Sequence, residues 1–241
     1  MPAKNTASKL ADSKKENSLK TEKKEEKKAV KAEPAKKNDG VVRNGSKVKM
    51  LDFPAYGTPT GQLITNYLKG DFGSLDKVSP YFATLLYSAD RYQFAEENQK
   101  ALDNGWTLIS NRYTQSNIGH QGSKFKGAER QEFMKWVNTV ECKMPQPDDV
   151  VYLDLPVKVS QKLLHSREGT KGAGKKDIHE QNVEYLKKTR KCYLEAAKKY
   201  NWIVIECVAQ GKSGIRPPEY IHNDIVARLR RRSWADLDSF L

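Results

Sequence analysis

Cysteine is scarce in this chain of 241 residues, and its scarcity excludes two ways of holding a fold together. The three cysteines, Cys142, Cys192 and Cys207, lie far apart, form no CxxC pair and have no histidine at ligand spacing. We therefore expect neither a disulfide framework nor a zinc site. A reducing compartment fits this usage best.

Long apolar runs are missing as well. No stretch approaches the roughly 18 apolar residues of a membrane-spanning helix, and the amino terminus lacks the apolar centre of a signal peptide. We expect a cytoplasmic protein, or a nuclear one if the N-terminal lysine clusters act as an import signal.

Residues 1–45 contain almost no large apolar side chain and consist mainly of Lys, Glu, Ala, Ser and Asn. Such a segment buries too little surface to offset the entropy of ordering its backbone, so we expect a disordered tail. A short charged helix, a nuclear-import signal and a nucleic-acid-binding arm are the alternatives. No aromatic residues alternate with these lysines as a stacking platform, so nucleic acid is not an expected partner except through the basic tail.

Positive charge is in excess. Lys and Arg outnumber Asp and Glu by 43 to 30, a net charge of +13. Residues 1–46 hold 13 basic and 7 acidic side chains, so +6 of the charge lies there and +7 in the remainder. This balance favours polyanionic partners such as nucleotides, nucleic acid or an anionic membrane surface.

Apolar patterning begins at Ser46 and predicts one domain over residues 46–233, followed by a C-terminal tail at 234–241. The expected strands alternate with helices, which predicts an α/β fold with a doubly wound parallel sheet. The strand within 149–155 is apolar enough to be buried on both faces. We expect strands at 47–54, 106–110, 149–155 and 202–208, and helices at 61–69, from 80 towards 105, 128–142, 157–166, 180–200 and 217–232.

Polar and aromatic residues gather where a ligand site is expected in such a sheet, beyond the carboxyl ends of the strands. Phe53-Pro54, Asn111-Arg112-Tyr113 and Asp154 each follow a strand, the second group leading into a polar, glycine-containing loop. One helix carries Tyr87 and Arg91 one turn apart on the same face. A ring and a guanidinium can cover a flat base and bond its edge, and a second arginine can hold a phosphate, so we predict a nucleotide site.

Two simpler interpretations remain for that helix. Tyr87 on an apolar face is often a core residue, and Arg91 is often an ion-pair partner of a nearby carboxylate, here Asp90 or Glu96.

The chain resembles the thymidylate kinases, in particular their archaeal-like branch. The similarity covers about residues 46–232, and its most specific parts are LLYSADR at Leu85–Arg91 and NRYTQSNIGHQG at Asn111–Gly122. It continues through FPAYG, YLKGDFG, PQPDDVVYLDLP, DIHE and PPEYIHNDI. The resemblance implies the sheet of the P-loop nucleoside monophosphate kinases and transfer of the γ-phosphoryl group of ATP to dTMP, giving dTDP, with Mg²⁺ as cofactor and a homodimer as the assembly.

The resemblance also implies roles for individual residues. Tyr87 would stack on the thymine ring, Arg91 would bond its edge, and Arg112 would grip the acceptor phosphate. The other substrate-binding positions would be Phe53, Asn117 and Gln121, with Asn111 and Arg167 joining Arg112 in the catalytic group.

The glycine-rich basic segment at 167–177 is similar to the lid that closes over the donor phosphates in this family. It carries Arg167, Lys171, Lys175 and Lys176 and rejoins the next helix near Asp177 and Glu180. An ordinary solvated connection is the alternative. His120 and His179 are expected to line a pocket or donate hydrogen bonds, not to bind metal.

Two departures from the family pattern bear on activity. The expected first strand, the GxDGxGKxT phosphate loop and the helix after it do not occur in the printed sequence, and Gly40–Lys47 is no substitute because its Ser and Lys stand in the wrong order. The predicted sheet therefore lacks its central strand. Asn111 also stands where the family has Asp, so a neutral amide replaces a carboxylate expected near magnesium. A catalytically inactive nucleotide-binding relative, or an incomplete chain, is the alternative to an active kinase.

Overall fold

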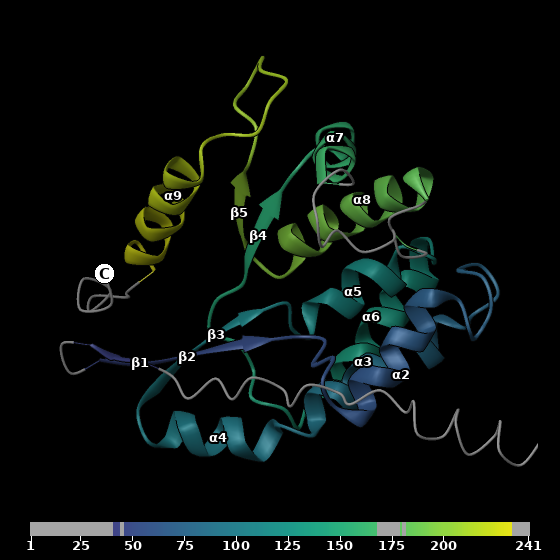
Figure 1. Ribbon diagram of the computed structural model, residues 1–241, viewed down its shortest axis with the longest axis horizontal. Coiled ribbons are helices and arrows are strands. Elements are labelled where there is room, and N and C mark those ends of the chain that lie inside the picture. The colour runs from purple at the N-terminus through teal and green to yellow at the C-terminus, as the bar shows by residue number, and fades with distance from the viewer. Residues whose placement is uncertain (1–40, 44–45, 168–178, 180–181, 233–241) are drawn as a thin grey trace, which may run out of the picture. The chain divides into compact units, whose positions relative to one another are not determined.

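The computed structural model describes residues 41–43, 46–167, 179 and 182–232, all within the unit Ala35–Leu241. Helices and parallel strands alternate along this part of the chain, so the predicted α/β class is confirmed (Figure 1). No helix within the described ranges is long and apolar enough to cross a membrane. The predicted tail at 1–45 lies almost wholly outside these ranges, apart from a strand at 41–43.

The first sheet has the order β1-β2-β3. Its strands are β1 (Val41–Arg43), β2 (Ser46–Asp52) and β3 (Trp106–Asn111), with β1 antiparallel and β3 parallel to β2. The parallel register pairs Asp52 with Asn111, so the polar residues that end the two strands lie side by side. This sheet edge is where the site is found.

The second sheet pairs β4 (Val151–Asp154) with β5 (Ile203–Glu206) in parallel. Helix α9 (Pro218–Arg230) packs Ile221 against β5 in a buried apolar cluster. The described strands therefore form two separate sheets and not one doubly wound sheet. A doubly wound sheet without its central strand would fall into two parts of this kind.

The helices that surround the site bury two further clusters. One joins Phe133, Val137 and Cys192 around Ile118, and the other packs Ala83 on Tyr67. The helices are α2 (Pro59–Lys69), α3 (Pro80–Tyr92), α4 (Ala95–Asp103), α5 (Gln115–Gly122), α6 (Gly127–Glu141), α7 (Val157–Arg167) and α8 (Val183–Lys199).

Three local predictions were wrong. The helix expected from Pro80 towards Gly105 is broken in two between Tyr92 and Ala95. At this break the ring of Phe94 packs on the ring of Phe53, with the two centroids 6.0 Å apart. The loop expected after Tyr113 is helix α5, which is stabilised by its contacts with α8 and not by the polar pattern of its own sequence. β4 is not buried on both faces, because Leu153 is 48% exposed in a sheet of only two strands.

Candidate active site

One pocket collects side chains from helix α3, helix α5 and the segments that follow β2 and β3. Arg91 and Arg112, predicted to share a site, both line it. The pocket is lined by Phe53, Pro54, Tyr87, Arg91, Arg112, Ser116, Asn117, His120 and His179.

Helix α3 positions Tyr87 and Arg91. Pro80 occupies its first turn, where a missing backbone N–H costs no hydrogen bond, and Ala83 and Thr84 are buried. The ring of Tyr87 packs edge-to-face against the ring of Tyr67, with centroids 6.1 Å apart, and Tyr87 also lines the pocket. Its two expected roles are therefore compatible.

Arg91 is 2% exposed and pairs with Glu141 at the end of α6, not with Asp90 or Glu96. Both of those carboxylates are used elsewhere. Asp90 accepts a hydrogen bond from the backbone N–H of Ala55 at 2.8 Å, and Glu96 pairs with Lys100. The simple interpretation of Arg91 as a surface ion-pair partner is thus wrong, because its guanidinium is buried.

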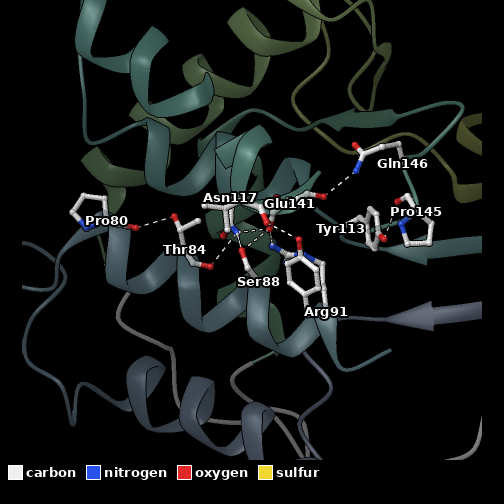
Figure 2. Close-up of polar contacts among 11 residues, drawn as sticks. Pro80, Thr84, Ser88, Arg91, Tyr113, Asn117, Glu141, Pro145 and Gln146 are labelled. Atoms are coloured by element: carbon white, nitrogen blue, oxygen red, sulfur yellow. Dashed lines mark hydrogen bonds and ion pairs between the residues drawn. The ribbon is translucent and has the colours of Figure 1, made fainter. Parts of the chain in front are cut away.

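Glu141 is at the centre of a buried polar cluster (Figure 2), and it does not itself line the pocket. Its Oε1 accepts hydrogen bonds from Ser88 Oγ at 2.7 Å, from Asn117 Nδ2 at 2.9 Å and from Arg91 Nη2. All four side chains are buried, so the charges of Arg91 and Glu141 offset each other where water could not stabilise them. Sequence reasoning missed Glu141, although an acidic residue four positions after Val137 on the inward helix face was a usable signal.

Arg112 projects from the turn after β3 with its backbone in the left-handed region, at φ 63°. A residue with a Cβ rarely adopts this conformation, and such strain concentrates at functional sites. The side chain is exposed, and its Nη2 lies 3.3 Å from Nε2 of His120. Arg112 is therefore an accessible cation at the rim of the pocket.

His120 connects Arg112 to a chain of aromatic side chains. Its Nδ1 lies 3.2 Å from the Tyr185 hydroxyl, which donates to the His120 carbonyl at 3.1 Å. Its ring stacks on His179, whose Nε2 lies 2.9 Å from the Tyr67 hydroxyl. Burial, followed by the charges of Arg112, His179 and Lys124, holds the pKa of His120 well below 6.5. A neutral ring can accept from Arg112 at Nε2 and donate to Tyr185 at Nδ1.

Asn111 ends β3 and donates a hydrogen bond from Nδ2 to Oδ1 of Asp52 at 2.8 Å. Both side chains are exposed at the carboxyl ends of neighbouring strands. Asp52 therefore places a carboxylate beside the Asn111 amide.

The other predicted residues divide into two groups. Gln121 is fully buried, has no hydrogen-bond partner for its amide among the described residues, and does not line this pocket. Arg167 ends α7, and its side chain lies outside the described residues, as do Asp177, Glu180 and the three lid lysines, Lys171, Lys175 and Lys176.

Comparison with known proteins places these features in a family. A family described as Thymidylate kinase matches residues 40–213. A probable thymidylate kinase of Pyrobaculum aerophilum is 30% identical over 175 residues, covering 72% of this chain and 78% of that protein. The thymidylate kinase of Fervidobacterium nodosum is 34% identical over 145 residues, 59% of this chain and 66% of that protein.

A solved structure gives the same result at the level of the fold. The thymidylate kinase of Candida albicans superposes with a TM-score of 0.52 at 22% identity, covering 80% of this chain and 81% of that one.

Proposed function

The chain belongs to the thymidylate kinase family, and from this premise we propose that it transfers the γ-phosphoryl group of ATP to dTMP. The observation that carries the proposal is the convergence of Arg91 and Arg112 on one pocket that is also lined by Tyr87 and Asn117. One arginine is buried and the other exposed, which suits a base edge and a phosphate respectively.

The acceptor nucleotide would lie between α3 and α5. Tyr87 would cover the thymine ring, and Arg91 with Asn117 would bond its edge. Arg112 would hold the acceptor phosphate as a charge-assisted pair, and Phe53 would close the pocket beside it. Phosphoryl transfer needs positioning and charge neutralisation more than a covalent nucleophile, and these residue types provide both.

Asp52 and Asn111 suit a magnesium ion. They offer a carboxylate and an amide oxygen at the same sheet edge, and Mg²⁺ bound to nucleotide phosphates takes one or two carboxylates with water and phosphate oxygens. When bound, the ion would neutralise the charge on the donor phosphates. The lid residues Arg167, Lys171, Lys175 and Lys176 would add positive charge there and exclude water.

The proposal extends to assembly and location. A homodimer is supported by the apolar side chains exposed on and near α3, namely Phe72, Tyr81, Phe82 and Leu85. The proposed compartment is the cytoplasm, which agrees with the low cysteine content, and the lysine clusters leave the nucleus as the alternative.

The test separates acceptor binding from transfer. Calorimetry should show that the full chain binds dTMP, and an assay with ATP and Mg²⁺ should show dTDP. Arg112→Ala should weaken dTMP binding by about tenfold or more, because it removes a hydrogen-bonded charge. The matched control, Arg130→Ala, removes an arginine that pairs with Glu195 and does not line the pocket.

Equal dTMP affinity in Arg112→Ala and the wild type would contradict the assignment of the phosphate site. Binding of dTMP without formation of dTDP would leave the pocket correct and identify a nucleotide-binding protein that does not phosphorylate.

A further inference from the structure

Glu141 does not line the nucleotide pocket, yet it contacts two residues that do. It is 2% exposed, and its Oε1 accepts from both Arg91 and Asn117. A carboxylate can only accept hydrogen bonds, so each neighbour must turn a donor towards it. Glu141 thereby fixes which donors and acceptors of Arg91 and Asn117 remain available to a ligand in the pocket.

Asn117 shows the effect most clearly. Its Nδ2 lies 2.9 Å from Glu141 Oε1, and 3.3 Å from both Ser88 Oγ and the Thr84 carbonyl. Ser88 donates its own proton to Glu141 at 2.7 Å, so its oxygen accepts from Asn117. Every contact therefore involves the NH₂ group, and Asn117 Oδ1 has no hydrogen-bond partner in the described part of the chain. Asn117 offers the pocket an acceptor.

Arg91 offers the opposite character. Its Nη2 bonds Glu141, and a guanidinium carries only donors. Among the residues that line the pocket, Asn117 on α5 thus offers an acceptor and Arg91 on α3 offers a donor. Thymine presents N3–H as a donor beside O4 as an acceptor, whereas cytosine presents N3 as an acceptor beside a donating N4 amino group. The arrangement matches thymine and opposes cytosine.

Glu141 is itself held in place. Gln146 Nε2 donates to the Glu141 carbonyl at 3.0 Å, and the Tyr92 hydroxyl donates to the preceding carbonyl, that of Val140, at 2.7 Å. Tyr113 Oη donates to the Pro145 carbonyl at 2.9 Å, beyond the end of the same helix (Figure 2). These hydrogen bonds fix the backbone at and after the end of α6, the segment that carries the Glu141 carboxylate.

We propose that Glu141 is a positioning residue that sets the base selectivity of the pocket by orienting the Asn117 amide and the Arg91 guanidinium. The inference rests on the proposed function, since it assumes that a pyrimidine monophosphate occupies the pocket. Glutamine at this position keeps the shape but carries an NH₂ group that can donate. In that variant Asn117 can present either end of its amide to the ligand.

The test compares dTMP with dCMP. Dissociation constants for both are measured by calorimetry on the full chain, and selectivity is the ratio of the dCMP value to the dTMP value. Glu141→Gln should lower this ratio by about tenfold, because a site built for one hydrogen-bonding pattern rejects the reverse pattern strongly only while its groups are fixed. The matched control, Glu195→Gln, removes a carboxylate from another arginine pair and should leave the ratio unchanged.

A second variant guards against misfolding of the first. Ser88→Ala removes one donor to Glu141 and one acceptor of Asn117 while keeping the ion pair, and it should lower the ratio about threefold. If either folded variant weakens dTMP and dCMP in parallel, with the ratio unchanged, Glu141 has only a structural role and the inference fails. If the wild type binds neither nucleotide, the proposed function fails first.

Discussion

At the scale of single residues, His120 predicts a dependence of stability on pH. Its folded pKa is held well below 6.5 by burial and by Arg112, His179 and Lys124, whereas the unfolded chain takes up a proton near 6.5. As the pH falls below 6.5 the unfolded state gains the proton first, so the folded state loses stability. This group contributes at most about 1.4 kcal/mol per pH unit.

Urea unfolding between pH 5 and pH 7.5 measures this dependence. His120→Gln should flatten the slope below pH 6.5, because the neutral amide keeps hydrogen-bonding capacity and does not titrate. The control is His222→Gln, which changes an exposed histidine on α9. A slope that survives in His120→Gln would show that other groups cause it.

The sequence predicted the residues that line the pocket better than the polar cluster that supports them. Tyr87, Arg91, Arg112 and Asn117 were expected because their motifs are recognisable in the chain, and they do line one pocket. Glu141 was not expected. Its place on the inward face of α6 indicates burial, but its partners lie 24 to 53 positions away, and such long-range pairs leave no pattern in the local sequence. Buried polar clusters depend on which helices meet, and local sequence does not encode that.

At the scale of helices and strands, Gly119 controls how closely α5 approaches α8. A Cβ at this position would lie 2.3 Å from the ring of Tyr193, and that ring is stacked on Tyr152 with centroids 4.9 Å apart. Gly122 on the same helix is less crowded, since its Cβ would lie 3.3 Å from Cys192 Sγ. The two glycines are therefore a matched pair.

Gly119→Ala should destabilise the fold by about 1–3 kcal/mol, which is typical of overpacking. Gly122→Ala should stay within about 1 kcal/mol of the wild type, because alanine's gain in helix propensity, about 1 kcal/mol, offsets the closer contact. Chemical unfolding of both variants measures the difference. Equal effects would mean that Tyr193 moves aside without cost.

The positions of most elements followed from apolar periodicity and from Pro and Gly at helix ends. Helix α5 did not, because its short sequence is polar and its stability comes from Ile118 and Gly119 packing on other helices. The break after Tyr92 was missed for a related reason. The local sequence around Phe94 is compatible with a helix, but Phe94 packs on the ring of Phe53, a residue 41 positions away.

At the scale of the whole molecule, the proposed homodimer gives a prediction about mass in solution. Leu85 is 48% exposed on α3, so a charge there would have to be buried in the dimer without a partner. Leu85→Glu should shift the mass measured by light scattering from that of a dimer to that of a monomer. The control, Tyr220→Glu, places the same charge on α9, where Tyr220 is 63% exposed. A monomeric wild type would refute the dimer.

The division of the strands into two sheets leaves the outer margin of β3 without a neighbour among the described strands. Its backbone N–H and C=O groups can pair with an extended segment of another chain. Ile109, which is 48% exposed, adds an apolar side chain to the same surface. Concentrated solutions of the protein are therefore at risk of growing ordered aggregates through this margin. Each copy carries a net charge of +13, and repulsion between copies opposes this aggregation. Because salt screens the repulsion, added salt should promote precipitation.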